Sequence, residues 1–193
     1  ATFDNFFVKT TEERQMLEFV KGQVQKYLAG MTGNTLISGS TGIGKSHLSL
    51  ALAKEINESF REKHEPKSVL FVSLTEIIKQ IKEGWAYGRN ANLTEYEAVK
   101  KLVDVDFLII DDLGAKNGTV TPKSDWEQDF LFDIINNRET TIFNTNLDSS
   151  ELRTVYNARN SSRILKGLEG NTFKAFTIKD KRYTINTVRG EFQ

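Results

Sequence analysis

Residues 39–46 read Gly-Ser-Thr-Gly-Ile-Gly-Lys-Ser and match the phosphate-binding pattern G-x-x-x-x-G-K-[ST] at every fixed position. The pattern constrains the fold, because its backbone N–H groups can surround phosphates where a strand ends and a helix begins. The flanking sequence supplies both elements: residues 35–37 suit a short buried strand, and Leu48, Leu52 and Ile56 recur at helical spacing. The sequence therefore predicts a site for a nucleoside triphosphate.

Each part of this loop has a chemical task. The glycines let the backbone close around the phosphates, Lys45 reaches the β- and γ-phosphates, and the hydroxyl of Ser46 is a ligand for Mg²⁺. We expect the following residues to contact the nucleotide: Gly39, Ser40, Thr41, Gly42, Ile43, Gly44, Lys45, Ser46 and His47.

The composition excludes several other kinds of protein. The chain has 193 residues, enough for one well-buried α/β core, and no cysteine, which excludes disulfides and cysteine-ligated zinc. No apolar run is long enough to cross a bilayer, so we expect a cytoplasmic protein with no membrane partner. The 26 basic and 26 acidic residues balance, so the chain lacks the overall positive charge of a protein that binds DNA unaided.

Strand and helix patterns alternate along the chain, which is typical of a parallel sheet with crossover helices. Apolar runs predict further strands at residues 68–73, 107–110 and 140–143. Apolar residues at helical spacing predict helices at residues 74–84, 94–103, 125–137 and 160–166. The sequence therefore predicts an α/β fold with a central parallel sheet.

Two carboxylates follow the uninterrupted apolar strand at 107–110. Ligands bind at the carboxyl ends of parallel strands, so Asp111 and Asp112 are expected beside the phosphate loop. There Asp111 would hold Mg²⁺, and Asp112 would act as the base or orient the water that attacks the γ-phosphate. Alone, the pair would be more typical of an ordinary strand end.

Polar residues also follow the strand predicted at 140–143. Asn144, Thr145 and Asn146 are placed to orient the attacking water between the carboxylates and the γ-phosphate. As an isolated feature the same cluster would be typical of a turn.

The order of these motifs resembles one family of ATPases. The phosphate loop is followed by Leu-Ile-Ile-Asp-Asp-Leu-Gly at 108–114, Thr-Ile-Phe-Asn-Thr-Asn-Leu at 141–147 and Asn-Ser-Ser-Arg-Ile at 160–164. This order is similar to the AAA+ ATPase domain of DnaC/DnaI-type replicative helicase loaders, which IstB-type transposition helpers share. The resemblance extends from Phe-Asp-Asn-Phe at 3–6 to Lys-Asp-Lys-Arg at 179–182.

The resemblance implies a fold and a domain organisation. The fold would be an α/β P-loop NTPase of the AAA+ (ASCE) type, a three-layer sandwich with a central parallel sheet and no separate large lid domain. Residues 1–193 would form one AAA+ domain, with a lead-in and helix over 1–33 and the nucleotide-binding core over 34–193. The family's helicase-binding region precedes this domain, and we expect it to be absent from the sequence.

The resemblance also assigns roles to single residues. It implies ATP and Mg²⁺ as ligands, with Asp111 and Asp112 as the Walker B pair and Asn146 as the sensor of the γ-phosphate. Arg163 would be the arginine finger offered to a neighbouring subunit, accompanied by Arg159 at the interface; from the residues alone, Arg163 would be an ordinary surface arginine. Arg182 resembles the second sensor arginine.

A helix pair near residues 74–103 resembles the insertion with which initiators and loaders line a pore for single-stranded DNA. Lys79, Lys82 and Arg89 would then contact DNA phosphates, with Trp85 and Tyr87 available for stacking. The alternative is that the lysines lie on the solvent-exposed face of an amphipathic helix and the aromatic residues belong to the core.

Two functions remain open at this stage. The first is a slow, assembly-dependent ATPase that self-associates with ATP bound, engages single-stranded DNA and helps place a DnaB-type ring helicase. The second is a nucleotide-dependent recruitment module, such as an IstB-type transposition helper. In Asp112 the chain has an aspartate where many AAA+ proteins have glutamate, which favours slow turnover. The short turn after Arg138 suggests a phage-encoded form.

Overall fold

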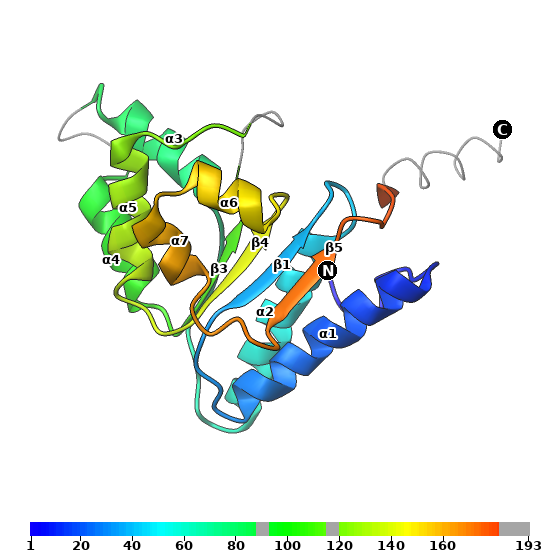
Figure 1. The fold of residues 1–193 in the computed structure, drawn as a ribbon. Coiled ribbons are helices and arrows are strands. Elements are labelled where there is room, and N and C mark those ends of the chain that lie inside the picture. The colour runs from blue at the N-terminus through cyan, green and yellow to red at the C-terminus, as the bar shows by residue number, and fades with distance from the viewer. Residues whose placement is uncertain (88–92, 115–119, 182–193) are drawn as a thin grey trace, which may run out of the picture.

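Parallel strands form the centre of the fold (Figure 1). The computed structural model describes residues 1–87, 93–114 and 120–181. Within these residues the sheet has five strands in the order β2-β3-β4-β1-β5. The strands are β1 (Thr35–Gly39), β2 (Val69–Ser73), β3 (Phe107–Asp111), β4 (Thr141–Thr145) and β5 (Thr172–Ala175). Each neighbouring pair is parallel, as the alternation of strands and helices predicted.

The strand order places the expected site residues at one edge of the sheet. β1 lies between β4 and β5, and Ser38 pairs with Thr145 of β4. β4 in turn pairs with β3, the strand that ends at Asp111. The carboxyl ends of β1, β3 and β4 therefore meet where a ligand binds in an open parallel sheet.

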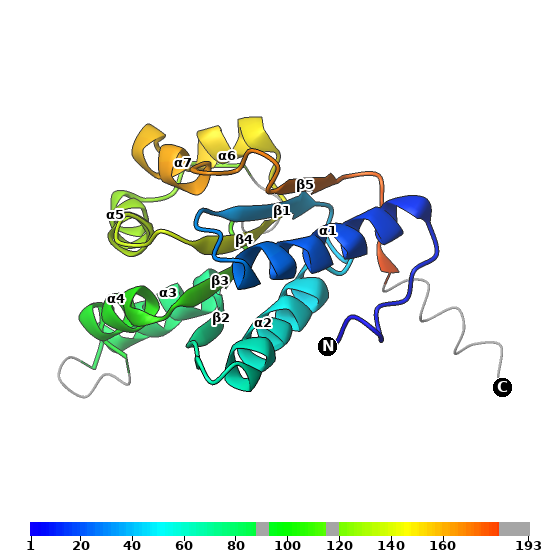
Figure 2. The same cartoon turned by 90° about the horizontal axis from the view of Figure 1, so that it is seen from below.

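Helices cover both faces of the sheet and make three layers. Figure 2 shows α1 (Thr11–Leu28) and α2 (Lys45–Glu62) on one side of the sheet, with α6 (Ser149–Val155) and α7 (Ala158–Ile164) on the other. The helices that pack on this second face are α3 (Leu74–Gly84), α4 (Glu95–Asp104), α5 (Asp125–Ile135), α6 and α7. The sheet is therefore buried on both sides, which explains the uninterrupted apolar runs in the sequence.

Alternate residues of the central strands pack into the apolar cores on opposite faces of the sheet. Ile109 and Ile142 pack with α1 and α2, whereas Leu108, Ile110 and Phe143 pack with the helices of the opposite face. All five side chains are fully buried. In contrast, every residue of the edge strand β2 is half-buried.

Some boundaries differ from the sequence expectations, and the differences have physical causes. The strand predicted at 140–143 runs on to Thr145 because β4 continues to pair with β1, so Asn144 is a buried strand residue. α5 ends at Ile135, two residues earlier than expected, and Asn137 donates a side-chain hydrogen bond to the carbonyl of Asp133 over 2.8 Å. The helix that carries Arg163 lies at Ala158–Ile164, two residues earlier than predicted.

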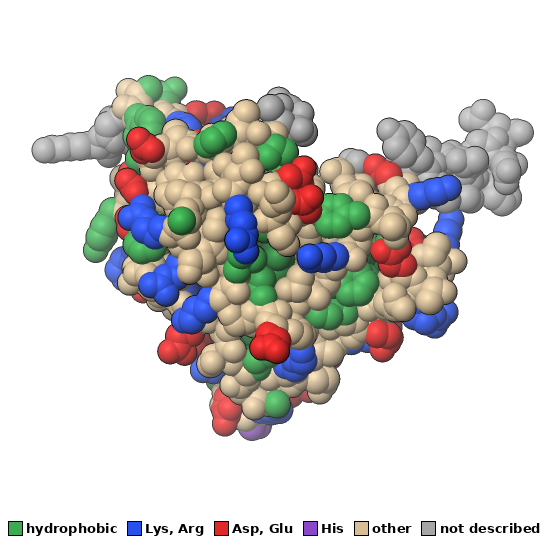
Figure 3. Space-filling model, in the orientation of Figure 1, with side chains coloured by type: hydrophobic (Ala, Val, Ile, Leu, Met, Phe, Trp, Pro, Cys, Tyr) green, Lys and Arg blue, Asp and Glu red, His purple; other side chains and the backbone are tan. Residues whose placement is uncertain are grey.

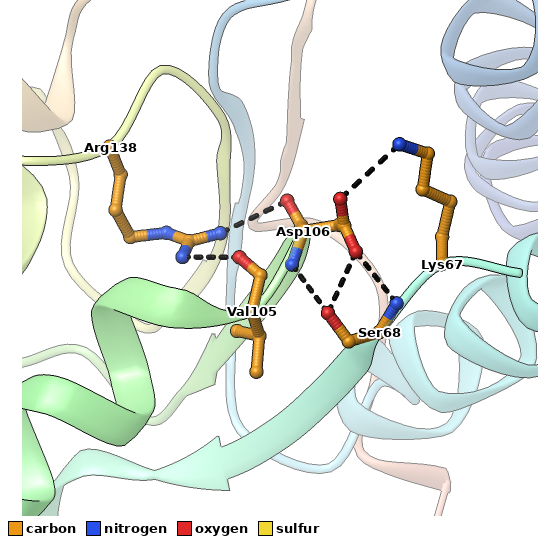
Figure 4. Close-up of polar contacts among 5 residues, drawn as sticks. All are labelled: Lys67, Ser68, Val105, Asp106 and Arg138. Carbon is orange, nitrogen blue, oxygen red and sulfur yellow. Dashed lines mark hydrogen bonds and ion pairs between the residues drawn. The ribbon is translucent and has the colours of Figure 1, made fainter.

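At the opposite end of the sheet, Arg138 links the turn before β4 to the segment between α4 and β3 (Figure 4). Its guanidinium donates to the carbonyls of Leu102, Val103 and Val105 over 2.9, 2.8 and 2.6 Å. These carbonyls lie at and just after the end of α4, where no following helical turn supplies N–H donors to them. A single side chain from the turn before β4 therefore closes the C-terminal end of α4.

Asp106 extends this network to β2. Its carboxylate accepts hydrogen bonds from the backbone N–H and the hydroxyl of Ser68, over 2.8 and 2.7 Å, and pairs with Lys67 at 3.3 Å (Figure 4). Burial would raise the pKa of Asp106, but the bonds from Ser68 and the charge of Lys67 outweigh it, so the pKa lies below its usual value.

In the described part of the chain, no helix is long and apolar enough to cross a membrane.

Candidate nucleotide-binding site

The phosphate loop connects β1 to α2 through two glycines in the left-handed region. Gly42 has φ of 79° and Gly44 has φ of 101°, conformations that L side chains rarely adopt. The helix begins at Lys45, directly after Gly44. The backbone N–H groups of the first helical turn are therefore directed at the loop, as phosphate binding requires.

Close neighbours leave no room for side chains at these glycines. A methyl group added to Gly44 would lie 2.6 Å from Cε2 of Phe6, which is buried against the loop. A methyl group on Gly42 would collide with the carboxylate of Asp180, and one on Gly39 with the carbonyl of Ala175. The loop is thus enclosed by the N-terminal segment, the end of β5 and the residues after it.

Lys45 lies inside the loop. Its ammonium group donates to the carbonyls of Gly39 and Ser40 over 2.7 and 2.8 Å. Burial lowers the pKa of Lys45, while the carboxylates of Asp112 and Asp111 act in the opposite direction. The lysine therefore supplies a partly desolvated positive charge at the place where the pattern requires one.

Asp111 receives two hydrogen bonds on one oxygen. Ser46 donates from its hydroxyl to Oδ1 over 3.0 Å, and the side-chain amide of Asn144 donates to the same atom over 2.8 Å. The three residues come from α2, β3 and β4, so these elements meet at one end of the sheet.

A hydrogen bond from Ser49 fixes the side chain of Asn144. The hydroxyl of Ser49 donates to its Oδ1 over 2.8 Å, so the amide nitrogen faces Asp111. Both Ser49 and Asn144 are fully buried. The sequence drew attention to the polar run 144–146 but not to Ser49, whose only signal is a hydroxyl one helical turn after Lys45.

Asn146, expected to sense the γ-phosphate, directly follows β4 and lies beside Gly114, two residues after Asp112. A methyl group on Gly114 would lie 2.8 Å from Oδ1 of Asn146, so the amide packs against that glycine. Its side chain is half-buried. Asn144 thus contacts Asp111 directly, whereas Asn146 lies beside the loop that carries Asp112.

Asp112 has an unusual backbone. Its φ is 57°, in the left-handed region, and its side chain is exposed. Aspartate enters this region more readily than most residues, because its short polar side chain can bond locally. The residue directly after the strand is therefore turned out of the strand direction and toward solvent.

His47 and Lys181 link the N-terminal segment to the loop. His47 makes a hydrogen bond through Nε2 to the carbonyl of Thr2 at 2.9 Å. Lys181 donates its backbone N–H to the carbonyl of Gly42 over 3.0 Å, and its ammonium group lies 3.7 Å from the centre of the Phe6 ring. These contacts hold a basic residue and an aromatic ring beside the phosphate loop.

The two arginines of α7 have different surroundings. Arg159 pairs with Asp129 at 2.5 Å and stacks over the ring of Phe132 at 4.0 Å. Arg163 is exposed, and it has no ion pair among residues 1–87, 93–114 and 120–181. Two other residues expected at the site, Arg89 and Arg182, lie outside the described residues.

The lysines expected to bind DNA on α3 are paired with acids. Lys79 lies 3.9 Å from Glu83, and Lys82 lies 3.6 Å from Glu127. Trp85 packs edge-on against Trp126, with the ring centres 4.9 Å apart, yet it remains 57% exposed. Tyr87 is also exposed. This surface therefore offers aromatic rings and little unpaired positive charge.

The residues at the loop fit a magnesium-bound nucleoside triphosphate. The described residues contain no group of three or more His, Cys, Asp or Glu side chains able to hold a metal ion. Mg²⁺ does not need such a group, because it is commonly held by one or two carboxylates together with substrate phosphates. Asp111 and the hydroxyl of Ser46, beside the cradle of Gly42 and Gly44, provide this donor set.

Comparisons with known proteins agree with this geometry. The family model described as IstB-like ATP binding protein matches residues 7–165. A search of curated proteins found no match.

Solved structures share the fold. The crystal structure of the DnaC helicase loader is 20% identical with a TM-score of 0.65, and the match covers 92% of this chain and 97% of that one. The crystal structure of DnaI is 21% identical with a TM-score of 0.64, over 94% and 90% of the two chains. AMPPCP-bound DnaA from Aquifex aeolicus is 22% identical with a TM-score of 0.65; the match covers 98% of this chain but 54% of that one.

These matches confirm the fold class expected from the sequence, an α/β P-loop NTPase of the AAA+ type. They also confirm the resemblance to IstB-like proteins and to the DnaC and DnaI helicase loaders.

Proposed function

Because the chain belongs to the IstB-like ATP-binding protein family, we propose that it is a slow ATPase that self-associates with ATP bound and helps place a ring helicase on single-stranded DNA. The observation that carries the nucleotide chemistry is the convergence of Ser46 and Asn144 on one oxygen of Asp111 beside the phosphate loop. Every fixed position of the loop pattern is present in residues 39–46.

The residues divide the work of phosphoryl transfer. The loop backbone and Lys45 would hold the phosphates, and Ser46 with Asp111 would hold Mg²⁺, which would supply charge neutralisation during the transfer. Asp112 is exposed beside Lys45 and positions the attacking water or accepts its proton. Residues 39–46 contain no arginine that could stabilise the charge of the transferred phosphoryl group, so we expect hydrolysis by one subunit to be slow.

A neighbouring subunit supplies the missing charge. Arg163 is exposed and makes no ion pair in the described part of the chain, so its guanidinium is available to another molecule. Arg159 is already paired with Asp129 and stacked on Phe132, which suits a role in shaping the interface. An arginine supplied in trans stabilises the transition state and makes hydrolysis depend on assembly.

The DNA contact is proposed directly after α3, through stacking on Trp85 and Tyr87. Trp85 and Tyr87 are exposed and aromatic, and bases stack on such rings with little sequence preference. The structure of replication initiator DnaA bound to AMPPCP and single-stranded DNA, which is 22% identical with a TM-score of 0.64, supports a search for such a contact. Lys79 and Lys82 contribute their charge only if DNA phosphates displace Glu83 and Glu127.

A specific observation favours a second candidate, a nucleotide-dependent recruitment module of the IstB type. On the face seen in Figure 3, basic and acidic side chains are interspersed, and the described lysines of α3 pair with acids. Because paired lysines leave little positive charge for phosphates, such a surface suits a protein partner better than a nucleic acid. In this case ATP would regulate partner binding, and DNA would leave hydrolysis unchanged.

A subunit-mixing assay tests the proposal. Asp112→Asn yields a subunit that binds ATP and offers Arg163 but cannot hydrolyse, whereas Arg163→Ala yields one that can hydrolyse but offers no arginine. Each variant alone should be nearly inactive, and their mixture should recover hydrolysis at the mixed interfaces. Wild-type activity per subunit should rise with protein concentration, and single-stranded DNA should increase it further.

The outcomes separate the candidates. Hydrolysis that is proportional to concentration, unaffected by Arg163→Ala and not recovered by mixing would overturn the trans arginine. Recovery by mixing without any response to single-stranded DNA would favour the recruitment module over the helicase loader.

A further inference from the structure

Side-chain amides hold α7, the helix of Arg163, at both ends. Asn160 in α7 donates to the backbone carbonyl and to Oε1 of Gln128 in α5, both over 2.8 Å. At the other end, Asn34 donates from Nδ2 to the carbonyl of Arg163 over 2.8 Å and to that of Ile164 over 3.2 Å. A helix of seven residues has little stability of its own, so these contacts decide how it lies.

Asn34 connects α7 to the sheet. It precedes β1, the strand that ends in the phosphate loop, and its side chain is 5% exposed. Its Oδ1 accepts a hydrogen bond from the backbone N–H of Thr141, the first residue of β4, over 2.9 Å. One buried amide therefore joins the starts of two central strands to the end of the helix that carries the exposed arginine.

The backbones at this junction are in close contact. Gly33 and Gly167 have φ of 118° and 71°, and a methyl group on Gly167 would lie 3.2 Å from the Cα of Gly33. The backbone N–H of Asn34 also donates to the carbonyl of Lys166 over 3.3 Å. The chain after α7 therefore has little freedom to shift without breaking the bonds of Asn34.

We infer that Asn34 is a positioning residue for Arg163, a role that rests on the function proposed above. It acts on the carbonyl of Arg163 itself, so it fixes the backbone from which the exposed guanidinium extends. Asn34 also belongs to the segment that leads into the phosphate loop. It therefore fixes the position of Arg163, which contacts one neighbouring subunit, relative to the ATP site of its own subunit, which faces the other neighbour.

A purely structural role predicts a different pattern of defects. If Asn34 only stabilised the fold, its replacement would weaken every activity of the subunit that carries it. A positioning role predicts a defect only when that subunit donates Arg163, and none when it supplies the ATP site. Mixing subunits separates these two positions.

The experiment places Asn34→Ala on one side of the interface at a time. In the donor arrangement, Asp112→Asn/Asn34→Ala is mixed with Arg163→Ala; in the acceptor arrangement, Asp112→Asn is mixed with Arg163→Ala/Asn34→Ala. The loss of a buried hydrogen bond predicts that the donor mixture falls about fivefold or more in kcat against the reference mixture. KM for ATP and the acceptor mixture should be unchanged.

Two further variants keep the test decisive if Asn34→Ala folds poorly. Asn34→Asp keeps the oxygen that accepts from Thr141 but turns a second oxygen toward two carbonyls, so it should share the donor defect. Asn137→Asp is the matched control, because Asn137 also donates to a last-turn carbonyl, that of Asp133 in α5. It should leave both mixtures unchanged.

Each outcome decides the matter. Equal defects in the donor and acceptor mixtures, or a donor mixture as active as the reference, would overturn the role of Asn34 while leaving the trans arginine intact. A reference mixture that recovers no activity would overturn the trans arginine and, with it, the role of Asn34.

Discussion

Asn144 donates a hydrogen bond from Nδ2 to Oδ1 of Asp111 over 2.8 Å, and Ser49 fixes the direction of that amide by donating to its Oδ1. A carboxylate that holds a metal depends on such partners for its orientation. Asn144 therefore belongs to the proposed magnesium site without being a ligand.

Replacing Asn144 should weaken magnesium-dependent hydrolysis. Asn144→Leu removes the donor to Asp111 and leaves the buried hydroxyl of Ser49 unpaired, so we expect the Mg²⁺ concentration for half-maximal hydrolysis to rise about tenfold. Ser49→Ala should give a smaller shift, because it removes only the support of the amide. An unchanged Mg²⁺ titration in a folded Asn144→Leu variant would contradict this role.

The backbone of Asp112 predicts the effect of lengthening its side chain. The residue has φ of 57°, a region that aspartate tolerates better than glutamate. We expect Asp112→Glu to lower the free energy of unfolding by on the order of 1 kcal/mol. It should not raise kcat, although many AAA+ proteins carry glutamate at this point.

The matched comparison is Asp112→Asn, which suits the same backbone. It should keep the wild-type stability and nucleotide affinity while losing hydrolysis. Chemical denaturation and steady-state hydrolysis of the two variants check both statements. An Asp112→Glu protein that is as stable as wild type and faster would show that the backbone does not disfavour glutamate.

Much of the fold was predictable from local patterns. The runs at 68–73 and 107–110 are apolar because both faces of the sheet are covered, and such runs are visible without a structure. The phosphate loop was predictable for a similar reason, since its chemistry requires consecutive residues. β5 and α6 were not predicted; β5 is a four-residue edge strand that contains Lys174, which weakens its pattern.

The contacts that complete the site were harder to predict from the sequence. Asn144 looks like a turn residue in the sequence, because only the fold reveals Ser49 and Asp111 as its partners. The link from Asn34 to Arg163 spans 129 positions and depends on the packing of α7. Sequence patterns report local periodicity, so pairs of polar residues brought together by the sheet order escape them.

Arg138 should be important for stability although it lies at the end of the sheet away from the phosphate loop. Its guanidinium donates to the carbonyls of Leu102 and Val103 at the end of α4. It also donates to the carbonyls of Val105 and Asp106 (Figure 4). Arg138→Met leaves these carbonyls without their donor, so we expect the free energy of unfolding to fall by about 2–4 kcal/mol.

Arg153 in α6 supplies the control for this prediction. It is exposed and takes part in none of the ion pairs or side-chain hydrogen bonds found in the described residues, so Arg153→Met should change the stability by less than about 0.5 kcal/mol. Equal stabilities of the two variants in urea would show that water replaces the guanidinium of Arg138 without loss.

Glu13 predicts how stability changes with pH. Burial would raise the pKa of Glu13, but hydrogen bonds from the backbone N–H groups of Lys9 and Thr10 and the charge of Lys181 outweigh it, so the pKa is lowered in the folded protein. A lowered carboxyl pKa stabilises the fold above the unfolded value of 4.5, and this contribution is lost as the pH falls through the folded value.

Glu13→Gln should therefore be less stable than wild type at neutral pH, by about 1 kcal/mol, because it loses the charge but keeps an oxygen for the backbone donors. The difference should shrink as the pH falls below 4.5 and vanish once Glu13 is protonated in both states. Urea unfolding across the acidic range measures it, with Glu18→Gln as control, since among the described residues Glu18 forms only an exposed pair with Lys21 at 3.8 Å. A difference that persists unchanged at acidic pH would show that the variant acts through packing and not through the charge of Glu13.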